Sequence, residues 1–285
     1  MENKTVIVTG ANAGIGKATT QKLAEMGAKI VMVCRNKKKG EIVLEEIREA
    51  TKNENLDLMI CDFASLQSIN NFVINFKEKY DKLDILINNH GAFFIRKSKT
   101  EDGIESTFAV NHLGYFSLTL QLLEMLKTTP KSRIINVSSG SNYKVQKVVL
   151  GDYNYDKRRY SMFKAYAESK LYNIMFTFLL NEKLQGTGIS VNCLHPGYVK
   201  TNIGLNHFLL RLIAPLVKYG AVKLEEGAET SVYLASSSEV EGVTGKYYHK
   251  MKLRDPNKLA FDKKLQQELW DLSLKLANFS LDNEI

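Results

Sequence analysis

The stretch TVIVTGANAGIGKA, Thr5 to Ala18, joins a run of β-branched apolar residues to three glycines, Gly10, Gly14 and Gly16. The apolar run predicts a buried strand, and the residues after the glycines have helical spacing. In such a position the first glycine can turn tightly, the second can admit a phosphate, and the third can let the helix pack on the strand. Amides at the helix start favour an anion, so the stretch predicts a phosphate-binding loop. A tight turn without a ligand is the alternative.

Apolar runs rich in Val and Ile recur along the chain, and each precedes a longer segment with helical spacing. They lie at 4–9, 29–34, 56–60, 83–88, 131–138 and 188–194. Strands that are apolar throughout are buried on both faces, as in a parallel sheet covered by helices. We therefore expect a doubly wound α/β fold with a mostly parallel sheet of seven strands and helices on both faces. The last strand falls near 246–249, and a final helix with Trp270 on its apolar side begins near 257.

Length and composition indicate one ordinary globular domain. The 285 residues include 44% apolar and 25% charged side chains, and no repeat or Pro/Gly-rich linker divides them. Cys34, Cys61 and Cys193 form no CxxC pair and lie in apolar strand-like segments, which is typical of a reduced compartment. The amino terminus lacks a signal peptide, and no run reaches the ~18 apolar residues of a membrane span. We expect a cytoplasmic protein with a single domain over 1–285.

The net charge of +8 is concentrated at 35–39, 157–159 and 246–254. An anionic partner could explain such clusters, but no nucleic-acid motif and no basic stripe interleaved with aromatic residues accompanies them. We therefore expect no nucleic-acid partner and interpret most of these cations as solvated surface. The first cluster is the exception, because it follows the second predicted strand.

Several further motifs follow the glycine loop, whose spacing is TGxxxGxG, in a fixed order. They are Asn88-Asn89-His90-Gly91, Asn111, Ser139, Tyr166-Ala167-Glu168-Ser169-Lys170 and Pro196-Gly197. Through this set the chain resembles the short-chain dehydrogenase/reductase family over roughly residues 4–250. The resemblance implies a single NAD(P)-binding Rossmann domain over 1–285. Within it, 202–225 would form the substrate loop or lid and 257–285 the C-terminal helix.

The end of the second strand predicts which dinucleotide is bound. An acidic residue there would accept hydrogen bonds from a ribose 2′-hydroxyl, whereas Arg35 suits a 2′-phosphate, and Lys17 and Lys39 could add positive field. This favours NADP(H), with a surface arginine as the alternative. Asp62 resembles the family's adenine-contacting acidic residue, although Asp is also a common helix cap. The resemblance implies these cofactor-binding residues: Gly10, Asn12, Gly14, Ile15, Gly16, Arg35, Asp62, Asn88, Gly91, Tyr166, Lys170, Pro196, Gly197, Val199 and Thr201.

Tyr166 and Lys170 are four residues apart in a strongly helical segment, so both project from one face. A nearby ammonium favours the phenolate and would bring the pKa of Tyr166 toward a value useful for acid/base chemistry. By resemblance, Lys170 also binds the nicotinamide ribose and Ser139 hydrogen-bonds the substrate oxygen, with Ser138 as the alternative. Asn111 matches the family's helical asparagine, whose backbone distortion holds a water linked to the lysine; alone it reads as a buried polar residue.

One position departs from the family pattern, because His90 stands where alanine is usual. We expect the backbone contacts of Asn88 and Gly91 with the cofactor to survive this change. We expect no metal site, because no second ligand has suitable spacing with His90.

The connection between Ser139 and Tyr166 is longer than in simple family members and includes DYNYDKRRY. Together with CRNKKKGE, SKTEDGIE, VNHLGYF and GKYY it resembles the retinol-dehydrogenase-like branch, which implies a lipophilic carbonyl or alcohol as substrate. Residues 208–217 are apolar except Arg211 and could cover that substrate, contact a membrane peripherally or form a core helix. The resemblance also implies a homodimer or homotetramer. A catalytically silent NADPH-binding regulatory or scaffold protein is the alternative function.

Overall fold

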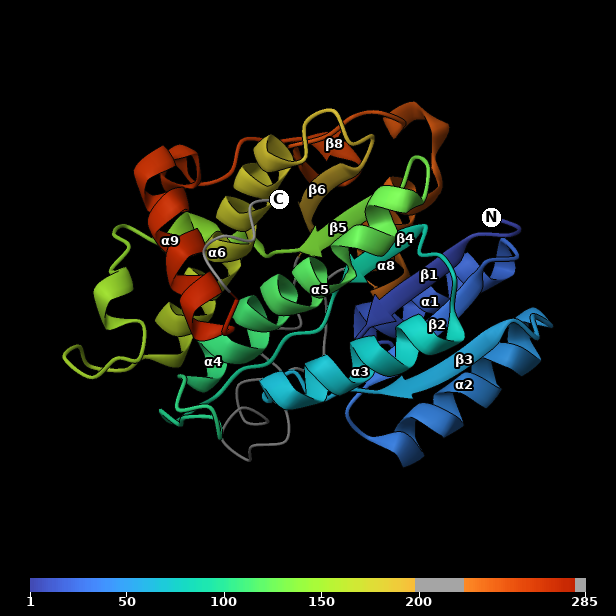
Figure 1. The fold of residues 1–285 in the computed structure, drawn as a ribbon, viewed down its shortest axis with the longest axis horizontal. Helices are drawn as coiled ribbons and strands as arrows, with labels where there is room; N and C mark the ends of the chain where they lie inside the picture. Colours follow the sequence, from blue (N-terminus) through green and yellow to red (C-terminus); the bar gives the residue numbers. More distant parts are fainter. Residues whose placement is uncertain (198–222, 280–285) are drawn as a thin grey trace.

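The computed structural model describes residues 1–197 and 223–279, in which a sheet lies between two layers of helices (Figure 1). Within these residues the strand order is β3-β2-β1-β4-β5-β6-β7-β8. The strands are β1 (Thr5–Thr9), β2 (Lys29–Cys34), β3 (Leu56–Ile60), β4 (Ile85–Asn88), β5 (Arg133–Val137), β6 (Ser190–His195), β7 (Tyr247–His249) and β8 (Lys252–Leu253). All neighbours are parallel except β7 and β8. The predicted doubly wound α/β fold is confirmed, with one short antiparallel strand, β8, beyond the seven expected.

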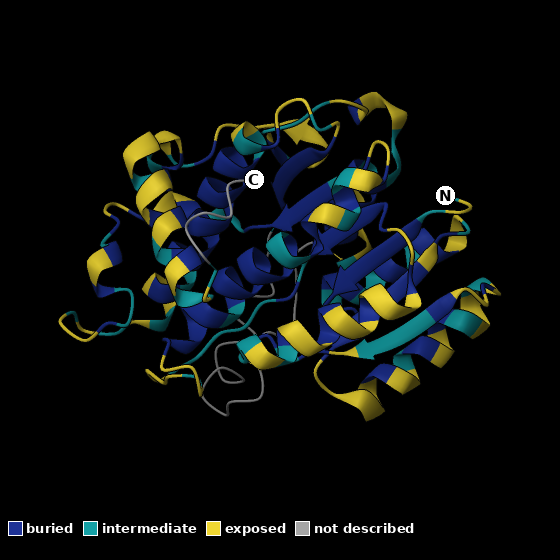
Figure 2. Cartoon of the chain, in the orientation of Figure 1, coloured by how far each residue is buried: buried dark blue, intermediate teal, exposed yellow. Residues whose placement is uncertain are grey.

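The helices divide between the two faces of the sheet. They are α1 (Gly14–Glu25), α2 (Lys37–Thr51), α3 (Leu66–Lys79), α4 (Ser106–Phe108), α5 (Gly114–Thr128), α6 (Met162–Lys183), α8 (Leu224–Ser236) and α9 (Lys263–Leu276). Apolar side chains of α1, α2 and α8 share one core cluster, and those of α3, α5, α6 and α9 share the other. Along β1, Ile7 belongs to the second cluster while Val6 and Val8 belong to the first, since strand side chains alternate between faces. Figure 2 shows the resulting buried sheet and the exposed outer faces of the helices.

The C-terminal helix begins later than the sequence predicts. A short 3-10 helix at Lys258–Phe261 comes first, and Asp262 then accepts a hydrogen bond from the Leu265 amide as the N-cap of α9. As expected, the apolar side of this helix carries Trp270, which packs against Phe116 with ring centroids 5.0 Å apart. The helix therefore covers the outer side of α5 and α6.

The strand order reverses between β1 and β4, which are neighbours in the sheet. In open α/β sheets ligands bind beside the carboxyl ends of the strands at such a point. The segments that follow β1 and β4, and those that follow β5 and β6, therefore frame the expected site. In the described part of the chain, no helix is long and apolar enough to cross a bilayer, and no group of three metal-ligating side chains occurs.

Candidate active site

The glycine loop needs its glycines for two separate reasons. Gly10 has a φ of +67°, and a Cβ there would lie 3.0 Å from the Cα of His90. A Cβ on Gly16 would lie 2.2 Å from the Gly10 carbonyl oxygen, so only glycine lets α1 approach the loop this closely. Helix α1 begins at Gly14 without a side-chain cap, which leaves its first amides free of side-chain acceptors. The loop thus has the close packing and the amides of an anion site.

A groove with a volume of about 670 Å³ runs beside this loop. One part is lined by Gly10, Asn12, Arg35 and Asp62, and another by the segment that follows Gly91. The guanidinium of Arg35 lies 3.7 Å from the Asp62 carboxylate, yet 74% of the Arg35 side chain remains exposed. An exposed arginine at the rim can reach a phosphate, and the glycine loop supplies amides for others. The donor set therefore fits a phosphorylated dinucleotide.

His90 fills the position where the family has alanine, and the structure accounts for its side chain. The ring stacks on Phe63 with centroids 3.5 Å apart, and its two nitrogens lie 3.0 Å from the Thr9 hydroxyl and 2.7 Å from the Val110 carbonyl oxygen. A carbonyl can only accept, so Nε2 carries the proton and Nδ1 of the neutral ring is left unprotonated beside the Thr9 hydroxyl. Burial lowers the pKa of His90 to about 3. The neutral ring therefore joins the end of β1 to the turn that holds Asn111.

Asn111 lies in a π-helical turn, Ala109–Leu113, between α4 and α5. Its side chain accepts from the Ala92 amide at 2.7 Å and donates to the Ala92 carbonyl at 3.0 Å. Its own backbone carbonyl accepts from the Asn173 side chain at 2.9 Å. A π-helical turn is a distorted helix of the kind often found at functional sites. Asn111 thereby fixes the chain that leaves β4 against the helix that carries Tyr166.

Tyr166, Lys170 and Ser139 lie together at the carboxyl end of β5. The Lys170 ammonium donates to the Val137 carbonyl at 3.0 Å and lies 5.8 Å from the centre of the Tyr166 ring. It also approaches Gly91, where a Cβ would lie 3.4 Å from Nζ. The three side chains and the segment after β4 therefore form one cluster next to the groove.

The pKa values in this cluster differ from the sequence-based expectation. Burial raises the pKa of Tyr166 to about 12, and the Ser139 hydroxyl acts in the opposite direction. Burial also lowers the pKa of Lys170 to about 7. The direction is opposite to the shift expected from a nearby ammonium, because loss of solvation disfavours the phenolate. Tyr166 is therefore a protonated phenol at neutral pH.

Two adjacent serines follow β5, and they have different environments. Ser138 is buried, and its hydroxyl donates to the Lys170 carbonyl at 2.7 Å. Ser139 lies beside the Tyr166 phenol, and its hydroxyl accepts from the Ser141 amide at 3.2 Å. Ser138 therefore ties β5 to the backbone of α6, whereas Ser139 is next to the Tyr166 phenol.

The remaining residues that were predicted to bind the cofactor lie in different environments. The Asn88 side chain is fully buried and donates to Asn136 on β5 and to Thr119 on α5, so only its backbone can face a ligand. Ile15 is a buried residue in the first turn of α1. Pro196 and Gly197 follow β6, and the Gly197 amide donates to His195. Val199, Thr201 and the segment 208–217 lie outside the described residues.

A cluster of ionic and polar contacts in the long connection before α6 was not predicted. Arg158 donates to Glu168 from both terminal nitrogens, at 2.8 and 3.3 Å, and its Nε donates to Asp152 at 3.2 Å. The Tyr155 hydroxyl donates to Glu168 at 2.7 Å, and only 3% of the Glu168 side chain is exposed. The interpretation of 157–159 as solvated surface is therefore wrong for Arg158. No local signal distinguishes it from Lys157 and Arg159, because its partner lies ten residues away on α6.

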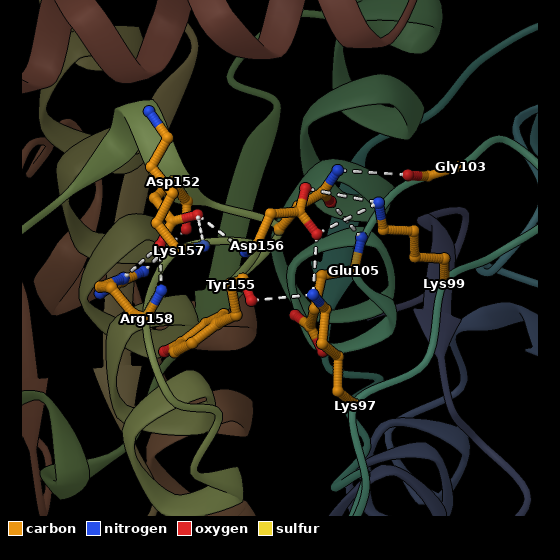
Figure 3. A network of polar contacts seen from close by, with 10 residues as sticks. Lys97, Lys99, Gly103, Glu105, Asp152, Tyr155, Asp156, Lys157 and Arg158 are labelled. Atoms are coloured by element: carbon orange, nitrogen blue, oxygen red, sulfur yellow. Dashed lines mark hydrogen bonds and ion pairs between the residues drawn. The ribbon is translucent and has the colours of Figure 1, made fainter.

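The same connection is also bound to the segment after β4 (Figure 3). Lys97 donates to the Asp156 carboxylate at 2.7 Å, and the Asn154 side chain accepts from the Glu105 amide at 2.7 Å. Glu105 in turn caps α4 by accepting from the Thr107 and Phe108 amides. The connection thus links the segment after β4 to the helix that carries Tyr166.

Comparison with known proteins gives a consistent result. The family model described as short chain dehydrogenase matches residues 4–208. Human retinol dehydrogenase 14 is 40% identical over 294 residues, covering 96% of this chain and 86% of that protein. A crystal structure of an uncharacterized protein from Mycobacterium paratuberculosis has a TM-score of 0.80 and 29% identity, covering 98% of this chain and 95% of the other. The Pseudomonas aeruginosa RhlG/NADP complex has a TM-score of 0.68 at 23% identity, covering 87% and 94%, and supports the fold alone.

Proposed function

Because the chain belongs to the short-chain dehydrogenase family and is retinol dehydrogenase-like, we propose that it is an NADP(H)-dependent oxidoreductase acting on a small lipophilic carbonyl or alcohol. In the reductive direction it would convert an aldehyde or ketone to an alcohol. The observation that carries this proposal is the cluster of Tyr166, Lys170 and Ser139 beside a groove that also contains the glycine loop. Turnover needs both the side-chain cluster and the groove with the glycine loop, whereas a scaffold protein would need neither the phenol nor the ammonium.

The preference for NADP(H) rests on Arg35. Its exposed guanidinium can bind a 2′-phosphate through two parallel hydrogen bonds, and Asn36 caps α2 directly after it. Gly10, Asn12 and the first amides of α1 would hold the pyrophosphate, and Asp62 the adenine. Lys170 would bind the nicotinamide ribose.

The chain's own residues would supply orientation and a proton. When bound, the nicotinamide gives or accepts the hydride, which is chemistry that no side chain provides. Tyr166 is protonated at neutral pH and can therefore donate its proton to the carbonyl oxygen during reduction, and Ser139 can donate a second hydrogen bond to that oxygen. In its protonated form, which a pKa of about 7 leaves partly populated at neutral pH, Lys170 favours the phenolate left behind. In the reverse direction the same phenolate removes the proton of an alcohol.

A lipophilic substrate agrees with the apolar residues of the groove and with the name of the human relative. Phe93, Phe94, Ile95 and Val110 line the groove next to the catalytic cluster. A homodimer or homotetramer, and contact of 208–217 with a membrane surface, remain predictions.

The decisive experiment follows NADPH absorbance while the purified chain is supplied with a panel of aldehydes, ketones and quinones. We expect consumption that depends on both enzyme and carbonyl, fastest with lipophilic aldehydes. Tight NADPH binding without consumption of NADPH by any member of the panel would favour the scaffold alternative. Failure to bind either NADPH or NADH would contradict both the oxidoreductase function and the scaffold alternative.

Replacing Arg35 by aspartate should reverse the choice of dinucleotide. The variant loses the charge-assisted bonds to the 2′-phosphate and gains an acceptor for the 2′-hydroxyl, so the ratio of kcat/KM for NADPH to that for NADH should fall roughly 10–100-fold. The measurement is steady-state kinetics with one carbonyl and both dinucleotides.

Lys147→Asp is the matched control, because it changes the net charge equally at an exposed lysine of the connection after β5. It should leave the ratio within about twofold. Equal ratios for Arg35→Asp and the parent chain would show that Arg35 does not choose the cofactor.

A further inference from the structure

The ring of Phe93 lies flat on the ring of Tyr166. Their centroids are 3.8 Å apart and their planes differ by 17°. Rings at this separation are in van der Waals contact, so no third ring fits between them. Phe93 also lines the groove. It therefore closes one face of the phenol ring.

The backbone on each side of Phe93 is held by hydrogen bonds. Asn111 binds both the amide and the carbonyl of Ala92, at 2.7 and 3.0 Å. The Tyr160 hydroxyl donates to the Phe94 carbonyl at 2.7 Å. With both neighbours hydrogen-bonded, the backbone that carries the Phe93 ring is held on each side.

Tyr160 is itself anchored by the connection that distinguishes this chain from simple family members. Its ring packs edge-on against Tyr155 with centroids 5.3 Å apart, and Tyr155 is bound to Glu168 on α6. Lys97 and Asp156 link the same connection to the segment that carries Phe93 (Figure 3). Phe93 and Tyr166 are therefore held together through one continuous set of contacts.

We infer that Phe93 determines substrate specificity, as an aromatic wall along Tyr166 that admits flat carbonyls and excludes those branched beside the carbonyl carbon. The inference rests on the proposed function and narrows it to conjugated, unbranched aldehydes. Such a substrate can bring its oxygen to the phenol from the Ser139 side while its plane lies along the Phe93 ring. A tetrahedral branch at the adjacent carbon would overlap that ring, and a steric clash of this kind is an effective way to reject a substrate.

The test compares Phe93→Ala and Phe93→Leu with the parent enzyme, using cinnamaldehyde as the flat substrate and camphor as the branched one. In Phe93→Ala the ratio of kcat/KM for camphor to that for cinnamaldehyde should rise at least about tenfold, since misfit of a single methylene group in an apolar pocket is already worth roughly 10–200-fold. Phe93→Leu keeps apolar volume without a flat face and should fall in between. Phe261→Ala removes a half-exposed phenylalanine elsewhere and should leave the ratio unchanged.

A second measurement does not need turnover. Tetranitromethane nitrates accessible tyrosine rings, and peptide mass spectrometry reads the modification at Tyr166. Nitration of Tyr166 should be at least about fivefold faster in Phe93→Ala than in the parent chain or in Phe261→Ala, because removing the Phe93 ring opens one face of the phenol.

Different results would contradict the role of Phe93 and the proposed function. An unchanged specificity ratio in an active Phe93→Ala enzyme, or equal nitration of Tyr166 in both chains, would overturn the role of Phe93. Absence of NADPH consumption by the parent chain with every carbonyl would instead remove the proposed function, and faster nitration in Phe93→Ala would still support Phe93 as the wall of the phenol.

Discussion

Tyr166→Phe is expected to lower kcat by about 10²–10⁴-fold, the range that general acid/base catalysis contributes. The change removes one oxygen from a ring that otherwise keeps its stack on Phe93. Ser139 and Lys170 remain in place, but neither can replace the lost donor, because Ser139 donates only a hydrogen bond and Lys170 is held by the Val137 carbonyl. NADPH binding should change little, since the dinucleotide would be held chiefly by the glycine loop and Arg35.

The measurement is kcat for the best carbonyl of the panel together with the Kd of NADPH from fluorescence titration. Tyr233→Phe is the control, because it deletes a hydroxyl on α8, which packs on the opposite face of the sheet, and this hydroxyl donates only to Glu239 among the described side chains. This control should retain the activity of the parent chain. A kcat of Tyr166→Phe within about threefold of the parent value would show that another group supplies the proton.

Features that depend on short-range periodicity could be predicted from the sequence. The apolar runs gave the positions of six strands, because a strand buried on both faces must be apolar throughout. The glycine spacing after β1 indicated an anion loop, and the close approach of Gly16 to Gly10 shows the steric reason. The four-residue spacing of Tyr166 and Lys170 put both on one face of α6.

Features that depend on contacts between residues far apart in the sequence could not be predicted. Phe93 acquires its role only because β4 and α6 bring it onto Tyr166, although the pair of aromatic residues after Gly91 offered a hint. The pKa of Tyr166 could not be predicted either. The direction in which this pKa shifts depends on how completely the phenol is buried. The spacing in the sequence predicts that an ammonium lies nearby, but it does not predict that the phenol loses its contact with water.

Arg158→Ala should destabilise the fold strongly, because it leaves a buried carboxylate without its cation. Glu168, whose side chain is 3% exposed, would retain the Tyr155 hydroxyl as its remaining side-chain partner. Breaking a buried ion pair by removing one member costs about 3–5 kcal/mol, and we expect the lower end, about 3 kcal/mol, because 17% of the Arg158 side chain is exposed. The measurement is the free energy of unfolding from urea titration at neutral pH.

Two further variants separate the ion pair from a general effect of shortening the side chain. Arg159→Ala makes the same change at the exposed neighbour and should alter the free energy of unfolding by no more than about 0.5 kcal/mol. The double variant Arg158→Met, Glu168→Leu removes the charges of this pair and should recover part of the loss, since Glu168 no longer leaves an unpaired buried charge. Asp152 loses the same cation but keeps its hydrogen bonds from the backbone amides of 156–158. Equal losses for Arg158→Ala and Arg159→Ala would show that the pair does not anchor the connection. If the double variant were as unstable as Arg158→Ala, the contacts of the Arg158 side chain with the Tyr155 ring would be the stabilising element instead.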